Sequence, residues 1–208
     1  ATQFVVVRHV ETVWNREGRI QGHLDSPLTA QGITQAIALA RRLSESRFDL
    51  LVSSDLGRAR VTAEYIAAKT GLAIVLDARL RERHYGIFQG MTRPEAQTTY
   101  PEIYRRYSQE DVAFAIPGGE SSQVCFERSV GCLRQLAATR TGQRILIVTH
   151  GGVVDGLHRH TMGLPHVGSR GFTVVNGSLN HFVYENGEWR MESLADVAHL
   201  DGNPLDDV

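Results

Sequence analysis

Continuous apolar runs recur along the chain at wide intervals and predict strands. The runs cover Phe4–Val7, Leu50–Val52, Ala73–Leu76 and Ile145–Val148. The first, second and fourth show none of the alternation that is typical of a strand with one face in water. We therefore expect these three strands to be buried on both faces, as parallel strands covered by helices are.

Amphipathic patterns between these runs predict helices. The expected helices run from Thr29 to about Ser44, from Asp55 to Gly71, from Ser121 onward, and from about residue 152 to 163. Thr29, Asp55 and Ser121 are the expected N-caps, because short polar side chains satisfy the first backbone N–H groups of a helix. Gly131 lies inside the third helix and should cost about 1 kcal/mol relative to alanine.

Two segments depart from the alternation of strands and helices. Residues 81–119 contain prolines, arginines and tyrosines without a long periodic pattern, and we interpret them as an insertion with two short helices that covers the active site. Leu179–Tyr184 and Trp189–Glu192 flank an Asn186-Gly187 turn, which predicts a hairpin. The pattern predicts an α/β fold, a three-layer α/β/α sandwich with a mostly parallel central sheet and an antiparallel edge strand. We expect residues 1–208 to form a single domain.

Composition argues against several classes of function. The 22 basic and 23 acidic side chains give a net charge of −1, so no basic excess indicates a nucleic-acid partner. The apolar runs are too short to cross a bilayer, and no signal peptide is recognisable. Cys125 and Cys132 lie too far apart along a helix for one disulfide and are expected to be buried thiols. These features predict a cytoplasmic protein without a membrane partner.

Chemically active side chains follow the predicted parallel strands at the points where those strands end. The first strand leads into Arg8 and His9, and the fourth leads into His150. Arg58 lies on the first turn after the second strand, and Glu82 follows the third. Taken singly, each residue has an ordinary structural explanation. Ligands of parallel sheets bind beyond the carboxyl ends of the strands, so we expect the five residues to converge.

This set of side chains matches the needs of phosphate-ester chemistry. Arginines neutralise an oxyanion, a neutral imidazole is a nucleophile, and a carboxyl group can protonate a leaving oxygen. His158 and His160 are two residues apart on a predicted helix and point to different sides, which argues against a metal pair there. Clustered carboxylates for Mg²⁺ are not evident either. We expect no metal and no cofactor.

The same residues lie in motifs that resemble the histidine phosphatase superfamily, in its phosphoglycerate mutase-like branch. The blocks that carry the resemblance come in the family's order and are Val7–Asn15, Gln21–Thr29, Ser53–Ala59, Leu80–Gly86, Pro117–Ser121 and Val148–Gly152. They span nearly the whole chain. The resemblance implies a phosphoglycerate mutase-like fold, and because members of this family often form dimers, it gives a homodimer as the candidate assembly.

The resemblance also implies a role for each matching residue. His9 would be the nucleophile that takes up the phosphoryl group, and Glu82 would protonate the leaving oxygen. Arg8, Arg58 and His150 would line the phosphate pocket. The further substrate-binding residues that it implies are Asn15, Gln21, Gly22, Gly151, Arg83, Tyr85, Arg105 and Arg106.

One position departs from the family's motif. Val10 stands where the motif has glycine. A β-branched residue is excluded in practice from positive φ. We therefore expect either an ordinary extended backbone at Val10 or a reshaped pocket.

The residues leave three functions open. A phosphatase lets water attack the phosphohistidine, whereas a mutase returns the phosphoryl group to another hydroxyl and uses 2,3-bisphosphoglycerate as its priming donor. The Glu82–Gly86 stretch and the Arg105-Arg106 pair resemble the mutase, but the insertion is brief, and a small cover gives water easier access. We favour a metal-independent phosphatase for a small anionic phosphate ester, such as a phosphoglycerate or a sugar phosphate. The alternatives are the mutase and a non-catalytic protein that binds a phosphorylated ligand.

Overall fold

The computed structural model describes residues 1–168, 170–202 and 204–206. Its strands form one sheet in the order β3-β2-β4-β1-β5-β6. The strands are β1 (Thr2–Arg8), β2 (Leu50–Ser53), β3 (Ile74–Leu76), β4 (Arg144–Thr149), β5 (Leu179–Glu185) and β6 (Glu188–Asp196). The pairs β1–β4, β4–β2 and β2–β3 are parallel, whereas β1–β5 and β5–β6 are antiparallel. The predicted α/β class is confirmed, and the predicted hairpin supplies both antiparallel strands.

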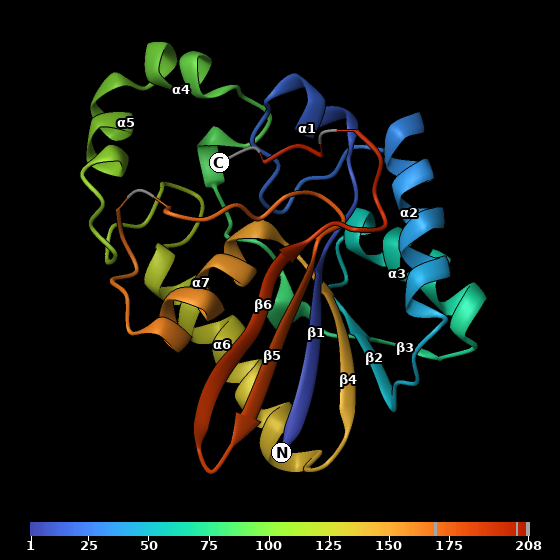
Figure 1. The fold of residues 1–208 in the computed structure, drawn as a ribbon. Coiled ribbons are helices and arrows are strands. Elements are labelled where there is room, and N and C mark those ends of the chain that lie inside the picture. Colours follow the sequence, from blue (N-terminus) through green and yellow to red (C-terminus); the bar gives the residue numbers. More distant parts are fainter. Residues whose placement is uncertain (169, 203, 207–208) are drawn as a thin grey trace.

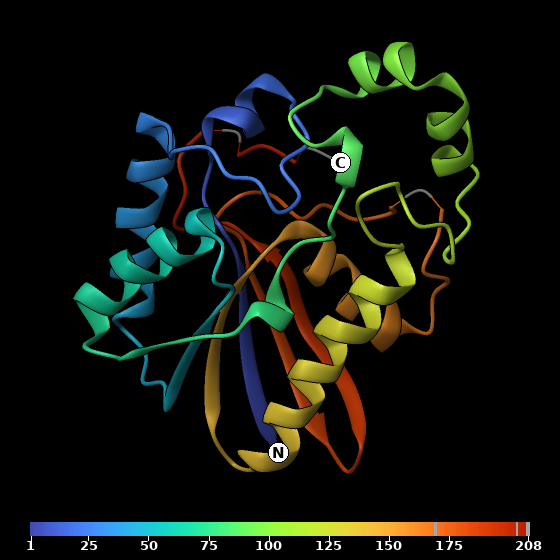
Figure 2. The same cartoon turned by 180° about the vertical axis from the view of Figure 1, so that it is seen from behind.

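Helices cover both faces of this sheet. The helices are α1 (Val13–Glu17), α2 (Ala30–Leu43), α3 (Gly57–Thr70), α4 (Arg93–Thr99), α5 (Pro101–Ser108), α6 (Ser122–Thr139) and α7 (Gly151–Met162). Helix α6 lies behind the sheet in Figure 1 and in front of it in Figure 2. Helices α2 and α3 pack on the other face, as the contacts of the core show.

The burial of β1 on both faces builds two separate cores. Phe4 and Val6 pack with side chains of α6 and α7. Val5 and Val7 point the other way and pack with side chains of α2 and α3. All four side chains are nearly inaccessible to solvent. The alternating directions of successive strand residues therefore explain why this run is apolar throughout.

Most predicted helix ends are confirmed, and one is wrong. Thr29 and Ser121 accept hydrogen bonds from the backbone N–H groups of Gly32 and Val124, as N-caps do. Asp55 does not cap α3: its carboxylate pairs with both sides of the Arg81 guanidinium, at 2.7 and 2.8 Å. The backbone N–H groups at the start of α3 instead donate to a carboxylate from a distant loop, described below.

The insertion contains the two expected short helices. Helices α4 and α5 lie beyond the carboxyl edge of the parallel strands, at the top of Figure 1. They have a small apolar core of their own around Phe88, Ala96 and Ile116. Helix α1 was not predicted, because its five residues fall in a stretch interpreted as a polar loop.

Two further predictions concern burial. Cys125 and Cys132 are buried and free, as predicted. Burial raises the pKa of each thiol to about 12, so both thiols are protonated at neutral pH. In the part of the chain that the structure describes, no helix has the length and apolar character needed to cross a bilayer.

Two helical glycines give a matched test of this packing. A β-carbon on Gly131 would meet no atom within 4 Å, whereas one on Gly32 would lie 2.0 Å from the carbonyl oxygen of Glu11. We expect Gly131→Ala to raise the free energy of unfolding by about 0.5–1 kcal/mol, because alanine loses less backbone entropy on folding. We expect Gly32→Ala to lower it by roughly 1–3 kcal/mol through overpacking. Urea denaturation of both variants measures the difference, and equal effects would contradict the packing described here.

Candidate active site

The register of β1 against β4 brings two histidines together. Arg8 pairs with Thr149 at the carboxyl ends of the two strands, so the residues that follow them are neighbours. The backbone N–H of His9 donates to the carbonyl of Thr149 at 3.0 Å. The ring centroids of His9 and His150 are 5.3 Å apart, and both residues are almost completely buried. The predicted convergence of these two side chains is therefore present.

The local backbone fixes the ring of His9. Its Nδ1 lies 2.8 Å from the carbonyl oxygen of Val10. A carbonyl oxygen can only accept, so Nδ1 carries the proton, and the lone pair of the neutral ring is on Nε2. The carbonyl oxygen of His9 accepts from Asn176 Nδ2 at 3.0 Å and from the N–H of Gly177 at 3.2 Å. Hydrogen bonds to backbone carbonyl groups thus fix the His9 ring with its lone pair on Nε2.

Val10 fits the site without unusual backbone geometry. Among the described residues, positive φ at non-glycine positions occurs at Glu110, Asn186 and Ala195, and not at Val10. The side chain of Val10 is fully buried in the core on the α2–α3 face. Its N–H donates to Thr62 Oγ1 at 3.3 Å. The motif glycine is therefore replaced here by a residue in ordinary backbone conformation.

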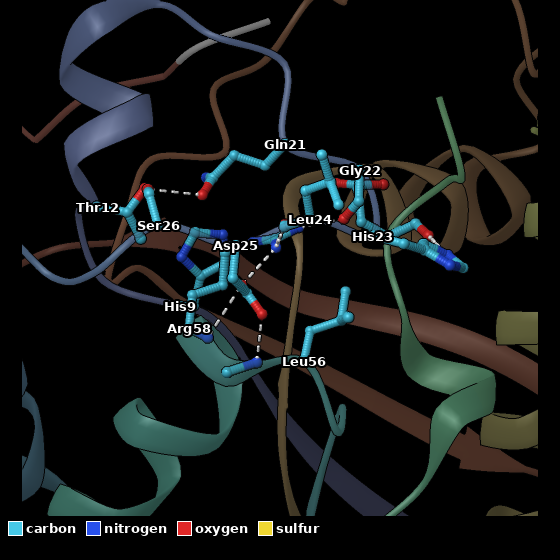
Figure 3. A network of polar contacts seen from close by, with 12 residues as sticks. His9, Thr12, Gln21, Gly22, His23, Leu24, Asp25, Ser26, Leu56 and Arg58 are labelled. Atoms are coloured by element: carbon cyan, nitrogen blue, oxygen red, sulfur yellow. Dashed lines mark hydrogen bonds and ion pairs between the residues drawn. The ribbon is translucent and has the colours of Figure 1, made fainter. Parts of the chain in front are cut away.

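A loop before α2 holds the guanidinium of Arg58 (Figure 3). Arg58 Nη2 donates to the carbonyl of Gly22 at 2.6 Å, and Nη1 donates to the carbonyl of Leu24 and to Asp25 Oδ1, both at 2.7 Å. Asp25 also accepts from the backbone N–H groups of Gly57 and Arg58, at 2.7 and 3.2 Å. One carboxylate therefore orients the arginine and caps the helix that carries it. Sequence reasoning gave Asp25 no role, and only its place before Pro27 in a matching block marked it.

Arg8 and His150 are buried beside this arginine. Arg8 Nη1 donates to the carbonyl of Val174 and lies 3.6 Å from the carboxylate of Asp206. His150 Nε2 and Ser54 Oγ share a hydrogen bond of 2.8 Å. Burial and the charge of Arg58 lower the pKa of His150 well below its ordinary value. His150 is therefore a neutral ring in this pocket.

Glu82 faces the histidine pair from the N-terminal end of α7. Its Oε1 accepts from the N–H of Arg83 at 2.8 Å, and its Oε2 accepts from the N–H of Gly152 at 3.0 Å. A β-carbon on Gly152 would lie 2.2 Å from Glu82 Oε1. The absence of a side chain at Gly152 is what lets the carboxyl group approach the helix so closely.

These side chains surround a pocket of about 140 Å³, the phosphate pocket. The predicted residues that line it are Arg8, His9, Asn15, Gln21, Gly22, Arg58, Glu82, Tyr85 and Gly151. His150 is not among its lining residues but lies edge-on to the ring of His9, which is. Desolvation raises the pKa of Tyr85 well above its ordinary value, so its phenol stays protonated and can donate a hydrogen bond.

Three predicted binding residues lie elsewhere. Arg83 lines a neighbouring cavity, where its guanidinium donates to the carbonyls of Glu120 and Phe114. Arg105 and Arg106 line neither cavity described here. Arg105 pairs with Glu102 on the exposed surface of α5, at 3.0 Å, and Arg106 stacks over the ring of Phe114. Neither side chain lines the pocket, and substrate binding by this pair stays a prediction.

Comparison with known proteins shows which family the chain belongs to. Residues 4–197 match the histidine phosphatase superfamily, branch 1. Phosphoglycerate mutase-like protein 4 of Arabidopsis thaliana is 40% identical over 96% of this chain and 87% of that protein. A metal-independent phosphoserine phosphatase from the same plant is 38% identical over 96% of this chain and 83% of that protein. The chain belongs to the histidine phosphatase superfamily, branch 1.

Solved structures of similar proteins agree with this fold. The structure of Bacillus stearothermophilus YhfR superposes with a TM-score of 0.88 at 31% identity, over 96% of this chain and 99% of that one. A mycobacterial glucosyl-3-phosphoglycerate phosphatase superposes with a TM-score of 0.81 at 32% identity, over 95% of this chain and 100% of that one. The predicted phosphoglycerate mutase-like architecture is therefore confirmed.

Several residues of the pocket were not assigned to the site from the sequence. They are Gly18, Arg19, Ile20, Gly152, Asp155 and Arg170. Arg93, a candidate of the insertion to face the substrate, also lines the pocket. Asp155 follows Gly151 by one helical turn, which was the available signal. Arg170 arrives from an irregular segment after α7, and no pattern marked it. Among the described residues, no group of three or more histidines, cysteines or acids is placed to hold a metal ion.

The contact between Asp25 and Arg58 can be tested with a matched control. We expect Asp25→Ala to raise the inhibition constant for inorganic phosphate about tenfold, because Arg58 loses its charged partner and α3 loses its cap. The control is Glu64→Ala, which removes a carboxylate that pairs with Arg60 on the exposed surface of the same helix and lines neither cavity. Measurement of the inhibition constant for phosphate checks both variants. An equal effect of the two variants would contradict a specific role for Asp25.

Buried histidines predict a loss of stability in mild acid. Burial lowers the pKa of His150 and also those of other imidazoles, including His158, His181 and His199. The unfolded chain binds protons at these rings near their ordinary pKa of 6.5, and the native state does not. Unfolding therefore takes up protons below about pH 6.5, and the free energy of unfolding should fall with pH in that range. Urea denaturation at pH 7.5 and 5.5 measures this, and an unchanged value would contradict the environment assigned to these rings.

Proposed function

We propose that this protein is a metal-independent phosphomonoester hydrolase that works through a phosphohistidine on His9. The observation that carries the proposal is the state of the His9 ring, whose Nδ1 is bonded to a carbonyl oxygen in a pocket lined by Arg8 and Arg58. An imidazole held in this way presents its lone pair at Nε2 next to two fixed cations. This is the arrangement that nucleophilic attack on a phosphate dianion requires.

In the first step His9 Nε2 attacks phosphorus, and the bond from phosphorus to the ester oxygen breaks. Arg8 and Arg58 neutralise the phosphoryl oxygens and hold the group in line with the nucleophile. Glu82 in its protonated form gives its proton to the leaving oxygen, and the alcohol departs. Because Glu82 is held by the N–H groups of Arg83 and Gly152, its position is fixed before substrate binds.

In the second step water attacks the phosphorus of the phosphohistidine. Glu82, now a carboxylate, takes a proton from that water, and the bond between phosphorus and Nε2 breaks. Inorganic phosphate leaves, and both His9 and Glu82 return to their starting forms. The same carboxyl group thus serves as acid in the first step and as base in the second.

Two observations support hydrolysis over transfer to a second hydroxyl. Arg105 and Arg106, which suggested a mutase, line neither described cavity. The phosphate pocket also adjoins a large open space described below, through which water can reach the phosphohistidine. The names of relatives include both types: a phosphoserine phosphatase and a mutase-like protein in one plant, and a glucosyl-3-phosphoglycerate phosphatase among solved structures. The proposed substrate is a small phosphorylated metabolite.

A first test compares wild type with His9→Ala and Glu82→Gln on an aryl phosphate in excess chelator. We expect phosphate release by the wild type and none by His9→Ala, because that variant lacks the proposed nucleophile. Glu82→Gln should slow release from an alkyl phosphate by a factor on the order of 10²–10⁴ and release from the aryl phosphate by less, because an aryl oxygen leaves without a proton. An acid-labile phosphoenzyme should form in wild type and not in His9→Ala. Wild-type rates in His9→Ala would end the proposal.

A further inference from the structure

A cavity of about 830 Å³ adjoins the phosphate pocket. Glu82, Tyr85 and Arg93 line both spaces, so the two are continuous at the proposed proton donor. Under the proposed function, the ester oxygen lies at Glu82, and whatever that oxygen carries extends into this second space. We call this second space the leaving-group cavity.

The volume of the leaving-group cavity is large for a three-carbon acid. Pockets of roughly 300–1,000 Å³ are those that enclose drug-sized ligands. A molecule of water takes about 30 Å³ of liquid, so a three-carbon group would leave most of the cavity filled with water. Volume alone therefore favours a larger alcohol.

Aromatic side chains reach the leaving-group cavity from separate parts of the chain. Tyr104, Tyr107 and Phe114 come from the insertion, Phe126 from α6 and Phe172 from the segment after α7. Such faces bind flat or ring-shaped groups through dispersion and ring contacts. A short acyclic acid makes little use of them, whereas a ring does.

Two of the arginines that line the leaving-group cavity are paired with carboxylates of the protein. Arg159 pairs with Asp155 at 2.8 Å and donates to three carbonyl oxygens. Arg170 lies 3.3 Å from the carboxylate of Asp206 and 3.7 Å from that of Asp155.

Arg93 has different surroundings. Arg93 Nη1 donates to the Tyr107 hydroxyl at 3.4 Å. Among the described residues, no carboxylate lies within ion-pairing distance of Arg93. The acids Glu110, Asp111, Asp155 and Asp206 also line the cavity. Carboxylates repel a second anionic group but accept hydrogen bonds from hydroxyls. A polyhydroxy group suits these surroundings, because its hydroxyls can donate to the carboxylates and accept from Arg93.

We propose that the alcohol part of the substrate is a ring-bearing polyhydroxy group, a furanose or pyranose with or without an attached base, and not a three-carbon acid. The inference rests on the proposed function and narrows its substrate class. The ring packs against the aromatic side chains, and its hydroxyls bond to the carboxylates. The phosphate pocket holds the phosphoryl group at the other side of Glu82.

A substrate series tests the inference on the wild-type protein. The probes are ribose 5-phosphate, glucose 6-phosphate and AMP against 3-phosphoglycerate and glycerol 3-phosphate. We expect kcat/KM for the best ring-bearing ester to exceed that for the best three-carbon ester by about tenfold or more. A preference for AMP over the two sugar phosphates would show that the base is part of the recognised group. The reverse preference would show that the sugar alone is recognised.

Two outcomes of this series would overturn the inference. One is a three-carbon ester that equals or exceeds every ring-bearing ester, and the other is hydrolysis of none of the ring-bearing esters. Either could occur with release that still depends on His9, so failure of the inference is distinguishable from failure of the proposed function.

Variants of Phe126 test the aromatic contact itself. We expect Phe126→Leu to reduce the ratio of kcat/KM between ring-bearing and three-carbon esters by about fivefold, and Phe126→Tyr to keep it within about twofold. The matched control is Phe48→Leu, which makes the same change at a ring that packs beside Arg144 and lines neither cavity. The ratio should not change in that control. A ratio unchanged in Phe126→Leu, or changed equally in Phe48→Leu, would contradict recognition by the aromatic side chains.

Discussion

The in-register parallel pairing of β1 with β4 is the constraint from which the site follows. Both strands end at the same edge, and the residue after each strand is a histidine. The register is held by side chains buried on both faces, each contributing roughly 1.5–3 kcal/mol to folding. A slip of one residue would exchange the two faces of β1 and separate the rings. The distance between His9 and His150 is therefore maintained by the core, together with the hydrogen bond from the His9 N–H to the carbonyl of Thr149.

Burying cations in this position costs solvation free energy, and carbonyl and carboxylate oxygens of the loops offset that cost by accepting hydrogen bonds. Arg58 is 3% exposed, yet carbonyl oxygens of Gly22 and Leu24 and the carboxylate of Asp25 accept its hydrogen bonds. These bonds also give the loop its shape, since its carbonyls turn toward the guanidinium (Figure 3). A buried charge without such partners would be strongly destabilising. The pocket is consequently organised before a phosphate arrives, which is the condition for electrostatic catalysis.

The parts of the fold that could be predicted from the sequence are those governed by local rules. Strand ends, the caps Thr29 and Ser121, and the Asn186-Gly187 hairpin depend on a few consecutive residues, and the site residues at strand ends followed from them. Helix α1 was missed because five residues are too few to show a helical period. Asp25 could not be identified as the cap of α3, because the approach of its loop to that helix is set by tertiary packing. Asp55, the nearer acid, was the better local candidate, but it pairs with Arg81.

The amphipathic character of α5 bears on whether the insertion suits a phosphatase or a mutase. Tyr104 and Tyr107 are three residues apart and share one face of the helix, where both rings lie within 6 Å of the ring of Phe88. That packing orients the helix, so Arg105 and Arg106 are left on its exposed surface. Tyr104 and Tyr107 line the leaving-group cavity, whereas Arg105 and Arg106 do not. An insertion that gives the leaving-group cavity an aromatic side therefore gives up the arginine pair that a carboxylate-bearing substrate would use.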